Sequence, residues 1–171
     1  MTMPGQFSKL DFYGKGPYET YIDRQSSARV GHYLQSVADQ YHYGYVHPQE
    51  SGTHIGLKWF RICDDSGRGL EITSPENFSA SALPFSRREL NAYATPYNPV
   101  EWQTHQSPYN HSLELKPLAH PFDRTNGHTC VNFDLMQMGL GCVNSFGALP
   151  RPEYRIPANE YRFDFIISPV L

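Results

Sequence analysis

The chain has 171 residues, of which 39% are apolar and 14% aromatic, so it is long enough to fold around a hydrophobic core, and a disordered chain is excluded. Its formal net charge of −3 is spread without basic runs, which excludes a nucleic-acid surface, and no stretch approaches the roughly 18 apolar residues of a membrane span. Charged residues make up 18%, whereas 12 Tyr, 10 Phe and 14 Pro favour strands over helices, so the composition predicts an all-β protein with an aromatic surface suited to sugars.

The clearest predicted element is a β-hairpin. Ile55, Leu57 and Trp59 alternate with polar or small residues, which is the pattern of a half-buried strand. The Asp- and Gly-rich residues 64–69 then turn the chain into a second strand at 70–73.

One short helix is predicted over residues 86–93. Ser86 and Glu89 have the spacing of a capping box, in which each side chain satisfies a free backbone donor of the first turn. We expect this helix only to close a loop.

Two further strands are predicted in the last third of the chain. Hydrophobic residues alternate with polar ones over 131–135 and again over 161–167. Strands joined by Pro- and Gly-rich connections predict an antiparallel β-sandwich. No repeat or linker divides the sequence, so residues 1–171 are interpreted as one unit.

Side chains with catalytic or metal-binding chemistry form no complete motif. Cys63, Cys130 and Cys142 are odd in number and lack a CxxC spacing, which favours small buried hydrophobic residues over a disulfide framework or a zinc site. The histidines show no HExxH pattern, and Asp64 and Asp65 are expected to be hydrated in their Gly-rich turn. The residues alone therefore indicate an all-β domain with an aromatic, sugar-compatible surface.

Three sequence blocks carry a more specific signal. Residues 12–24 are FYGKGPYETYIDR, residues 45–52 are YVHPQESG, and residues 138–146 are MGLGCVNSF. In the same order, these first, second and third blocks resemble signature segments of the family-2 β-galactosidases. The resemblance covers nearly the whole chain.

The resemblance implies a fold and its surroundings. In that family the blocks belong to the last domain, an antiparallel supersandwich related to galactose mutarotase, and this chain would supply roughly its second half. We therefore expect the sequence to be truncated upstream. Half a supersandwich exposes sheet edges and an apolar face, so we also expect the chain to associate with itself.

The resemblance also implies a parent enzyme, a retaining glycoside hydrolase that acts on terminal β-galactosides. Its two catalytic glutamates lie about 5 Å apart in a TIM barrel and are assisted by magnesium. No motif of that barrel or of its magnesium site occurs here, so the segment is expected to hold no catalytic residue and no cofactor of its own, and to be inactive alone. Its implied partners are the rest of the chain, or a large subunit carrying the barrel, and the galactoside substrate.

The third block implies the substrate-binding residues. In the family it carries an aromatic side chain at the mouth of the active site, which stacks on the sugar beyond galactose. The matching residue is Phe146, with Asn144 and Ser145 beside it in a loop-like segment. Phe146 stands where the family has Trp, and Cys142 where it has Gly, so an aromatic face is kept and the indole donor is lost. The alternative is that Phe146 is an ordinary core aromatic.

In the other two blocks, one residue differs from the family pattern and two charged residues are expected to have structural roles. Ser51 stands where the family has Asn, and the loop around Pro48 is still recognisable. Asp23 and Arg24 are expected to form a structural ion pair or a loop clamp and not to touch sugar.

A monovalent cation site is a further implication, because some family members bind one through main-chain carbonyls. The matching positions are His47, Pro48, Leu90 and Tyr93. Carbonyl oxygens suit a hard cation whatever the side chain. The alternative is that water satisfies these loop carbonyls.

Three functions from different classes are compatible with the sequence: an accessory segment of a β-galactosidase, an independent carbohydrate-binding module, and a mutarotase-like epimerase. We expect the first, because the chain begins on a strand-like segment that the family places mid-domain. A binding module would begin at a domain boundary, and a mutarotase would bring a histidine and a carboxylate together in a cleft.

Overall fold

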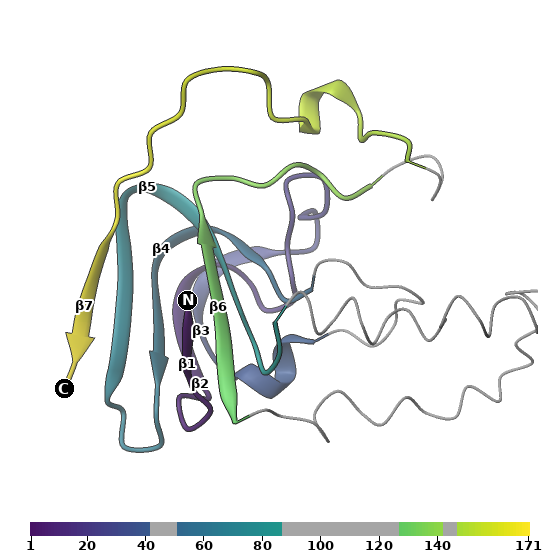
Figure 1. Cartoon of the computed structure of the whole chain (residues 1–171). Helices are drawn as coiled ribbons and strands as arrows, with labels where there is room; N and C mark the ends of the chain where they lie inside the picture. The colour runs from purple at the N-terminus through teal and green to yellow at the C-terminus, as the bar shows by residue number, and fades with distance from the viewer. Residues whose placement is uncertain (42–50, 87–126, 142–146) are drawn as a thin grey trace, which may run out of the picture.

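The structure is a computed structural model that describes residues 1–41, 51–86, 127–141 and 147–171 (Figure 1). Its strands are β1 (Thr2–Pro4), β2 (Lys9–Gly16), β3 (Arg29–Ser36), β4 (His54–Cys63), β5 (Gly69–Leu83), β6 (His128–Asp134) and β7 (Ile166–Val170). The 3-10 helices in these ranges are η1 (Val37–Gln40) and η3 (Pro152–Tyr154). The all-β prediction is confirmed.

The strands form one antiparallel sheet in the order β1-β6-β5-β4-β2-β3, with β7 paired to β5 outside this path. Strand β5 has 15 residues and is long enough to pair with two different strands along the same edge. Its residues 69–73 pair with β7, and its residues 79–83 pair with β6. Strand β4 runs along its other side.

The sheet is strongly curled, as the connection from β1 to β2 requires. Strands β6, β5 and β4 stand between β1 and β2 in the sheet, so a flat sheet would hold the two about 19 Å apart. The connection is residues 5–8 only, and Phe7 N–H donates to Pro4 O at 3.0 Å, so it is a turn and not an extended bridge. Thr129 Oγ1 on β6 donates to Phe7 O at 2.9 Å and ties this turn to β6. The curled sheet thus faces itself, which gives the sandwich-like arrangement expected from the sequence.

The hydrophobic core lies inside the curl and draws on both ends of the sheet. Phe12 is its centre, fully buried, with ring centroids 5.4 Å from Tyr33, 4.4 Å from His54 and 5.9 Å from Phe60. The core residues are Met3, Leu10, Phe12, Val37, Leu57, Phe60, Ile62, Ile72, Phe78, Ala80, Ala82 and Val131.

The predicted hairpin is confirmed as β4 and β5, but the prediction that one alternation runs through β4 is wrong. The pairing of β4 with β5 is irregular between His54 and Trp59, and Gly56 there has φ +66°. The irregularity changes the phase of the strand. Leu57 and Phe60 both face the core, whereas Trp59 lies on the outer face beneath Arg61, whose guanidinium carbon is 4.6 Å from the Trp59 ring centroid.

The predicted hydration of this hairpin turn is confirmed for Asp65 but not for Asp64, whose side chain is only 15% exposed. Asp64 Oδ1 accepts hydrogen bonds from Ser66 N–H at 2.8 Å and Arg68 N–H at 3.1 Å, so the carboxylate closes the turn. The Ser66 hydroxyl, followed by these backbone groups, lowers the pKa of Asp64. The Asp65 side chain is 88% exposed. These neighbours are therefore turn residues and not a catalytic pair.

The strand predicted over 131–135 is confirmed as β6. The strand predicted over 161–167 is confirmed only in its last residues, because the prediction placed its start too early. Strand pairing starts only at Ile166, which faces Thr73 of β5. Residues 161–165 lie outside the ladder, although Phe163 packs against the core and its ring centroid is 5.3 Å from that of Phe165. The alternation there reflects aromatic packing without a strand.

The predicted helix over 86–93 lies outside the described residues except for Ser86. A capping box does occur at η1, where Ser36 Oγ accepts from Asp39 N–H at 3.2 Å and Ser36 N–H donates to Asp39 Oδ2 at 3.1 Å. No helix in the described part of the chain is long and apolar enough to cross a membrane.

Two of the three cysteines can be placed. Cys63 is buried and Cys130 partly buried, and neither forms a disulfide within the described part of the chain. Burial raises the pKa of the Cys63 thiol, which keeps it protonated. Cys63 thus matches the expected small buried hydrophobic residue, whereas Cys142 lies outside the described residues.

His54 is a buried polar residue of the core that the sequence analysis did not single out. Its side chain is 1% exposed, with Nδ1 3.1 Å from Lys15 O and Nε2 2.7 Å from Gln40 Oε1. The loss of hydration on burial lowers the pKa of His54 to about 4, and it outweighs the Lys15 carbonyl and the negative charge of Glu19, which both favour the protonated ring. The folded protein therefore holds His54 neutral.

This burial predicts a pH dependence of stability. As the pH falls below about 6.5, the unfolded chain protonates His54 while the folded protein does not, so the free energy of unfolding falls until about pH 4. The loss is roughly 3 kcal/mol, because one pKa unit corresponds to about 1.4 kcal/mol. Denaturant unfolding of the protein and of His54→Gln between pH 7 and pH 4 measures it. Equal pH slopes for the two proteins would contradict the prediction.

Candidate functional site

The first block ends in a closed turn beyond β2. Tyr21 N–H donates to Arg24 O at 3.0 Å, and Arg24 N–H donates to Tyr21 O at 2.9 Å, which places Ile22 and Asp23 at the tip. The Tyr21 side chain is 2% exposed and anchors the turn in the protein. Two acidic side chains, Glu19 and Asp23, are thereby directed at other parts of the chain.

Glu19 ties the first block to the end of the second. Its Oε2 accepts from Gly52 N–H at 2.9 Å and from the Tyr21 hydroxyl at 3.1 Å, and its Oε1 accepts from Arg24 Nη1. The Glu19 side chain is 5% exposed, so these bonds are shielded from water. Gly52 has φ +67°, and a Cβ there would lie 2.6 Å from Gln40 O, so this approach requires glycine.

Asp23 ties the first block to the start of the third. Its Oδ2 accepts from Gly141 N–H at 2.5 Å. A Cβ at Gly139 would lie 2.6 Å from Asp23 Oδ2 and 2.8 Å from Tyr154 Cβ, and a Cβ at Gly141 would lie 3.0 Å from Asp23 Oδ2. Gly139 N–H also donates to Tyr154 O at 2.8 Å. The two glycines of the third block thus let the chain pass between Asp23 and Tyr154.

The expectation for Asp23 and Arg24 is confirmed, with a different pairing. Asp23 is a loop clamp, and Arg24 forms its ion pair with Glu19. Glu19 and Tyr21, which the sequence analysis did not single out, complete the arrangement. We call these four residues of the first block the bracket. It holds the chain at Gly52, two positions after residue 50, and at Gly141, directly before residues 142–146.

The predicted binding residues themselves lie outside the described residues. These are Phe146, Asn144 and Ser145 for the sugar, and His47, Pro48, Leu90 and Tyr93 for the monovalent cation. Their roles stay predictions. Within the described ranges, no three side chains among His, Cys, Asp and Glu lie close enough together to hold a metal ion.

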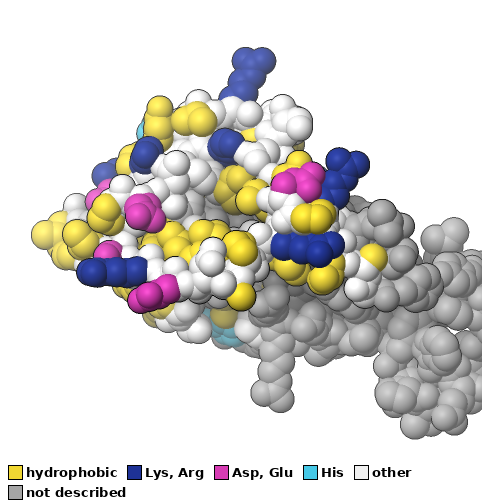
Figure 2. Space-filling view, turned by 90° about the horizontal axis from the view of Figure 1, so that it is seen from above, with side chains coloured by type: hydrophobic (Ala, Val, Ile, Leu, Met, Phe, Trp, Pro, Cys, Tyr) yellow, Lys and Arg dark blue, Asp and Glu magenta, His cyan; other side chains and the backbone are white. Residues whose placement is uncertain are grey.

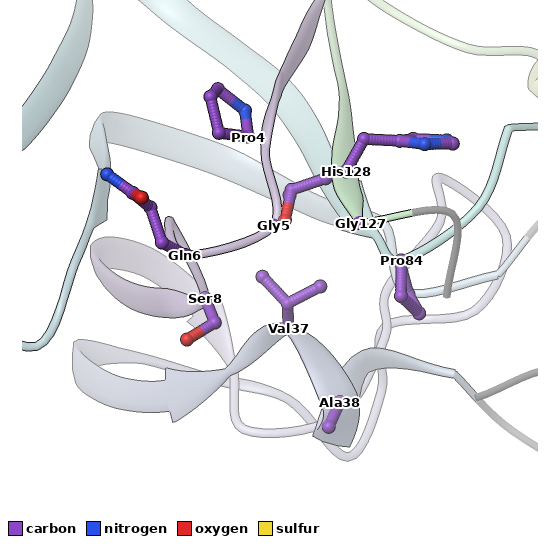
Figure 3. Close-up of a pocket in the computed structure, with 10 residues that line it drawn as sticks. Pro4, Gly5, Gln6, Ser8, Val37, Ala38, Pro84, Gly127 and His128 are labelled. Carbon is purple, nitrogen blue, oxygen red and sulfur yellow. The ribbon is translucent and has the colours of Figure 1, made fainter. Parts of the chain in front are cut away.

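A cavity of about 460 Å³ lies elsewhere, between the β1–β2 turn, η1 and the start of β6 (Figure 3). Its described lining contains no carboxylate, lysine or arginine and no residue of the three blocks. The lining residues are Pro4, Gly5, Gln6, Ser8, Val37, Ala38, Pro84, Gly127, His128 and Thr129. The cavity therefore lacks the charged groups that would orient a sugar, and it is separate from the bracket.

A histidine and a carboxylate do meet, on the outer face of the sheet. His32 Nε2 lies 2.5 Å from Asp11 Oδ1, and the His32 side chain is 55% exposed. Asp11 Oδ2 is 3.4 Å from Arg61 Nη1, and Arg61 Nε is 2.6 Å from Glu71 Oε2. This is a chain of cross-strand polar contacts, with Arg61 paired to both carboxylates, on an open surface and not in the cleft that a mutarotase would need.

Comparison with known proteins identifies the family of this chain. A family model described as the β-galactosidase small chain matches residues 1–167. The chain belongs to this family.

Bacterial β-galactosidases are among its relatives. The chain is 34% identical to the β-galactosidase of Halalkalibacterium halodurans over 166 residues, which are 95% of the chain and 14% of that relative. It is 32% identical to the β-galactosidase of Priestia megaterium over 170 residues, 99% of the chain and 14% of the relative. It is 31% identical to the β-galactosidase BgaC of Bifidobacterium adolescentis over 161 residues, 92% of the chain and 13% of the relative. The chain thus spans about one seventh of the length of these relatives.

The packing of the two glycines in this small-chain segment leads to a prediction. Gly139→Ala should destabilise the protein by about 1–3 kcal/mol, because the new methyl group is compressed between Asp23 and Tyr154. Gly141→Ala is the matched control and should cost less, because its methyl group would meet only the Asp23 carboxylate, at 3.0 Å. Thermal unfolding of both variants measures the difference. Equal melting temperatures would show that the chain is not confined at Gly139.

Proposed function

We propose that the chain is a non-catalytic part of a β-galactosidase that hydrolyses terminal β-galactosides, where it completes the mouth of the active site and binds the sugar beyond galactose. The observation that carries the proposal is the bracket, which ties the three family blocks together at Gly52 and Gly141. The match to the β-galactosidase small chain supports it.

In this proposal Phe146 stacks on the sugar beyond galactose, with Asn144 and Ser145 beside it. Phe146 follows the clamped Gly141 by five residues in a sequence rich in small and polar residues. An aromatic face contributes to sugar binding through apolar contact and through attraction of C–H groups to the ring. A platform of this kind needs a fixed base, which the bracket supplies at Gly141.

The chemistry of hydrolysis belongs to the rest of the enzyme. Glu19 and Asp23 are held by backbone N–H groups and by Arg24, and Asp11 and Glu71 are held by Arg61, so these carboxylates serve structure. We propose that the two catalytic carboxylates and magnesium lie in a barrel domain outside this segment. The monovalent cation would be held by the main-chain carbonyls of His47, Pro48, Leu90 and Tyr93.

The remainder of the β-galactosidase is the proposed partner. Large apolar side chains are exposed along residues 136–171, and Figure 2 shows hydrophobic side chains gathered around a hollow at this end of the molecule. The exposed ones are Met136, Met138, Leu140, Leu149, Ile156, Tyr161, Phe165, Ile166, Ile167 and Leu171. A surface of this kind is typical of a protein interface.

The purified chain tests this division of labour. It should not hydrolyse a chromogenic β-galactoside with or without magnesium, and it should form oligomers, because its apolar surface and sheet edges are uncovered. Turnover assays and light scattering at several concentrations measure the two properties. Turnover that persists through further purification, or a stable monomer at high concentration, would contradict the respective expectation.

Truncation of the stacking residue tests the proposed binding role. In the complete enzyme, Phe146→Ala should weaken the binding of free glucose as acceptor about tenfold, which corresponds to about 1.4 kcal/mol. Folding stability should change little. Tyr13→Ala, which truncates an exposed aromatic on the outer sheet face, is the control and should leave glucose binding unchanged.

The opposite pattern would identify Phe146 as a core residue. Truncating a buried Phe costs about 3–5 kcal/mol of stability. A sharp fall in melting temperature with unaltered glucose affinity would therefore refute the stacking role.

A further inference from the structure

The segment that leads into β7 has a polar side and an apolar side. Arg162 and Asp164 form an ion pair at 2.8 Å, and their side chains are 85% and 60% exposed. Phe163, Phe165 and Ile167 alternate with them, and the ring centroids of Phe163 and Phe165 lie 5.3 Å apart. Residues two positions apart therefore share a side. We call Phe163, Phe165 and Ile167 the C-terminal stripe.

The C-terminal stripe is only partly covered by the core of this chain. Phe163 packs against the core, and the ring centroid of Phe165 lies 4.7 Å from that of Phe133. Ile167 pairs with the fully buried Ile72 and so lies on the core side of β7. Even so, Phe165 is 43% and Ile167 is 42% exposed. Strand β7 lies beside β5 at one edge of the molecule, beyond the best-covered part of the core (Figure 1).

The free edge of β7 is poorly suited to a further strand. Pro169 pairs with Leu70 of β5, and its nitrogen has no hydrogen to donate. In an antiparallel ladder, proline is accommodated where the nitrogen points away from the paired strand, which here is toward the free edge. A strand added at that edge would lack one donor. The apolar face of β7 is therefore a better site for a partner than its edge.

The chemistry of the C-terminal stripe suits a protein partner and not a sugar. Its three side chains have no hydrogen-bonding atoms, whereas a sugar site needs polar groups that orient the ligand. An apolar surface beside a hydrated ion pair resembles the centre and rim of a protein interface. The chain spans about one seventh of the length of its β-galactosidase relatives, so most of the proposed enzyme lies outside it.

We propose that the C-terminal stripe is a docking face for the rest of the β-galactosidase, which packs an apolar element against Phe165 and Ile167 from the core side of β7. The partner covers this face and does not extend the sheet at the edge of β7. The inference rests on the part of the proposed function that makes the rest of the enzyme the partner. It narrows the exposed apolar side chains of residues 136–171 to one face of one strand.

Hydroxyl-radical labelling tests which side chains are covered. In the complete β-galactosidase, Phe165 and Ile167 should be labelled at least about fivefold more slowly than in the chain alone, because the partner excludes water from them. The chain alone is measured at a dilution at which light scattering shows a monomer. Ile166 pairs with Thr73 on the opposite face and is the internal control, which should keep its rate within about twofold. Equal protection of Ile166 would overturn docking on one face.

Two variants of neighbouring isoleucines test whether the covered face stabilises β7. In the complete β-galactosidase, Ile167→Asp should accelerate hydrogen exchange of residues 161–171 at least about tenfold, because it places a charge beneath the partner. Ile166→Asp is the matched control on the outer face and should change the exchange by less than about twofold. In the chain alone the charge at position 167 stays hydrated, because Ile167 is 42% exposed there, so the acceleration should be smaller.

The outcomes separate this inference from the proposed binding role. If Phe165 is labelled equally fast in the complete enzyme and in the chain, or if the two isoleucine variants exchange alike, docking on the C-terminal stripe is overturned whatever Phe146→Ala does to glucose binding. If Phe146→Ala leaves glucose binding unchanged while the C-terminal stripe is protected, the binding role fails and the docking face stands. Protection of Phe165 only when the chain associates with itself would assign the stripe to contacts between copies and overturn the proposal.

Discussion

The end of the molecule that carries the family blocks depends on hydrogen bonds from backbone N–H groups to two buried or half-buried carboxylates. Glu19 reaches Gly52, 33 residues away, and Asp23 reaches Gly141, 118 residues away. Hydrogen bonds to charged groups contribute about 1.5–3 kcal/mol each, more than bonds between neutral groups. Because each bond spans a long stretch of sequence, it fixes the placement of a whole loop base.

The curled sheet makes these bonds possible. The short β1–β2 turn brings both ends of the sheet around one core, and Phe12 in β2 is packed between Tyr33, His54 and Phe60. The first block therefore begins in strand β2 and ends in the bracket. Phe12 and the glycines of β2 are buried, whereas Glu19 and Asp23 bind backbone groups of the loops. A single short motif thus couples the stability of the sheet to the geometry of the site.

The sequence predicts those elements whose signal is local. The hairpin turn at 64–69 and the alternation in β6 depend on neighbouring residues, and both are present. The phase change in β4 depends on the irregular pairing near Gly56, and the start of β7 depends on where β5 offers partners, so neither follows from periodicity. The helical turn η1 had a detectable signal, the Ser36 and Asp39 capping pair.

The candidate site likewise has features that the sequence predicts and features that only the fold reveals. The resemblance locates the three blocks in the sequence. It does not predict that Glu19 binds Gly52 or that Asp23 binds Gly141, because no sequence spacing links these residues. The requirement for glycine at position 139 likewise arises from Tyr154 and Asp23, which the fold alone brings together. Only the three-dimensional arrangement explains why the blocks occur together.

The hydrogen bonds of Glu19 and Asp23 support the proposal that this segment is a non-catalytic part of a larger enzyme. A glycosidase nucleophile needs a carboxylate that can approach a sugar carbon, and an acid needs a proton held near neutral pH. Glu19 has both oxygens engaged by donors and is shielded from solvent, and Asp23 has one oxygen fixed on Gly141. These hydrogen bonds restrict the movement of both carboxylates. Such groups suit the positioning of a loop, which supports the proposal that this segment serves substrate binding and that bond cleavage takes place in another domain.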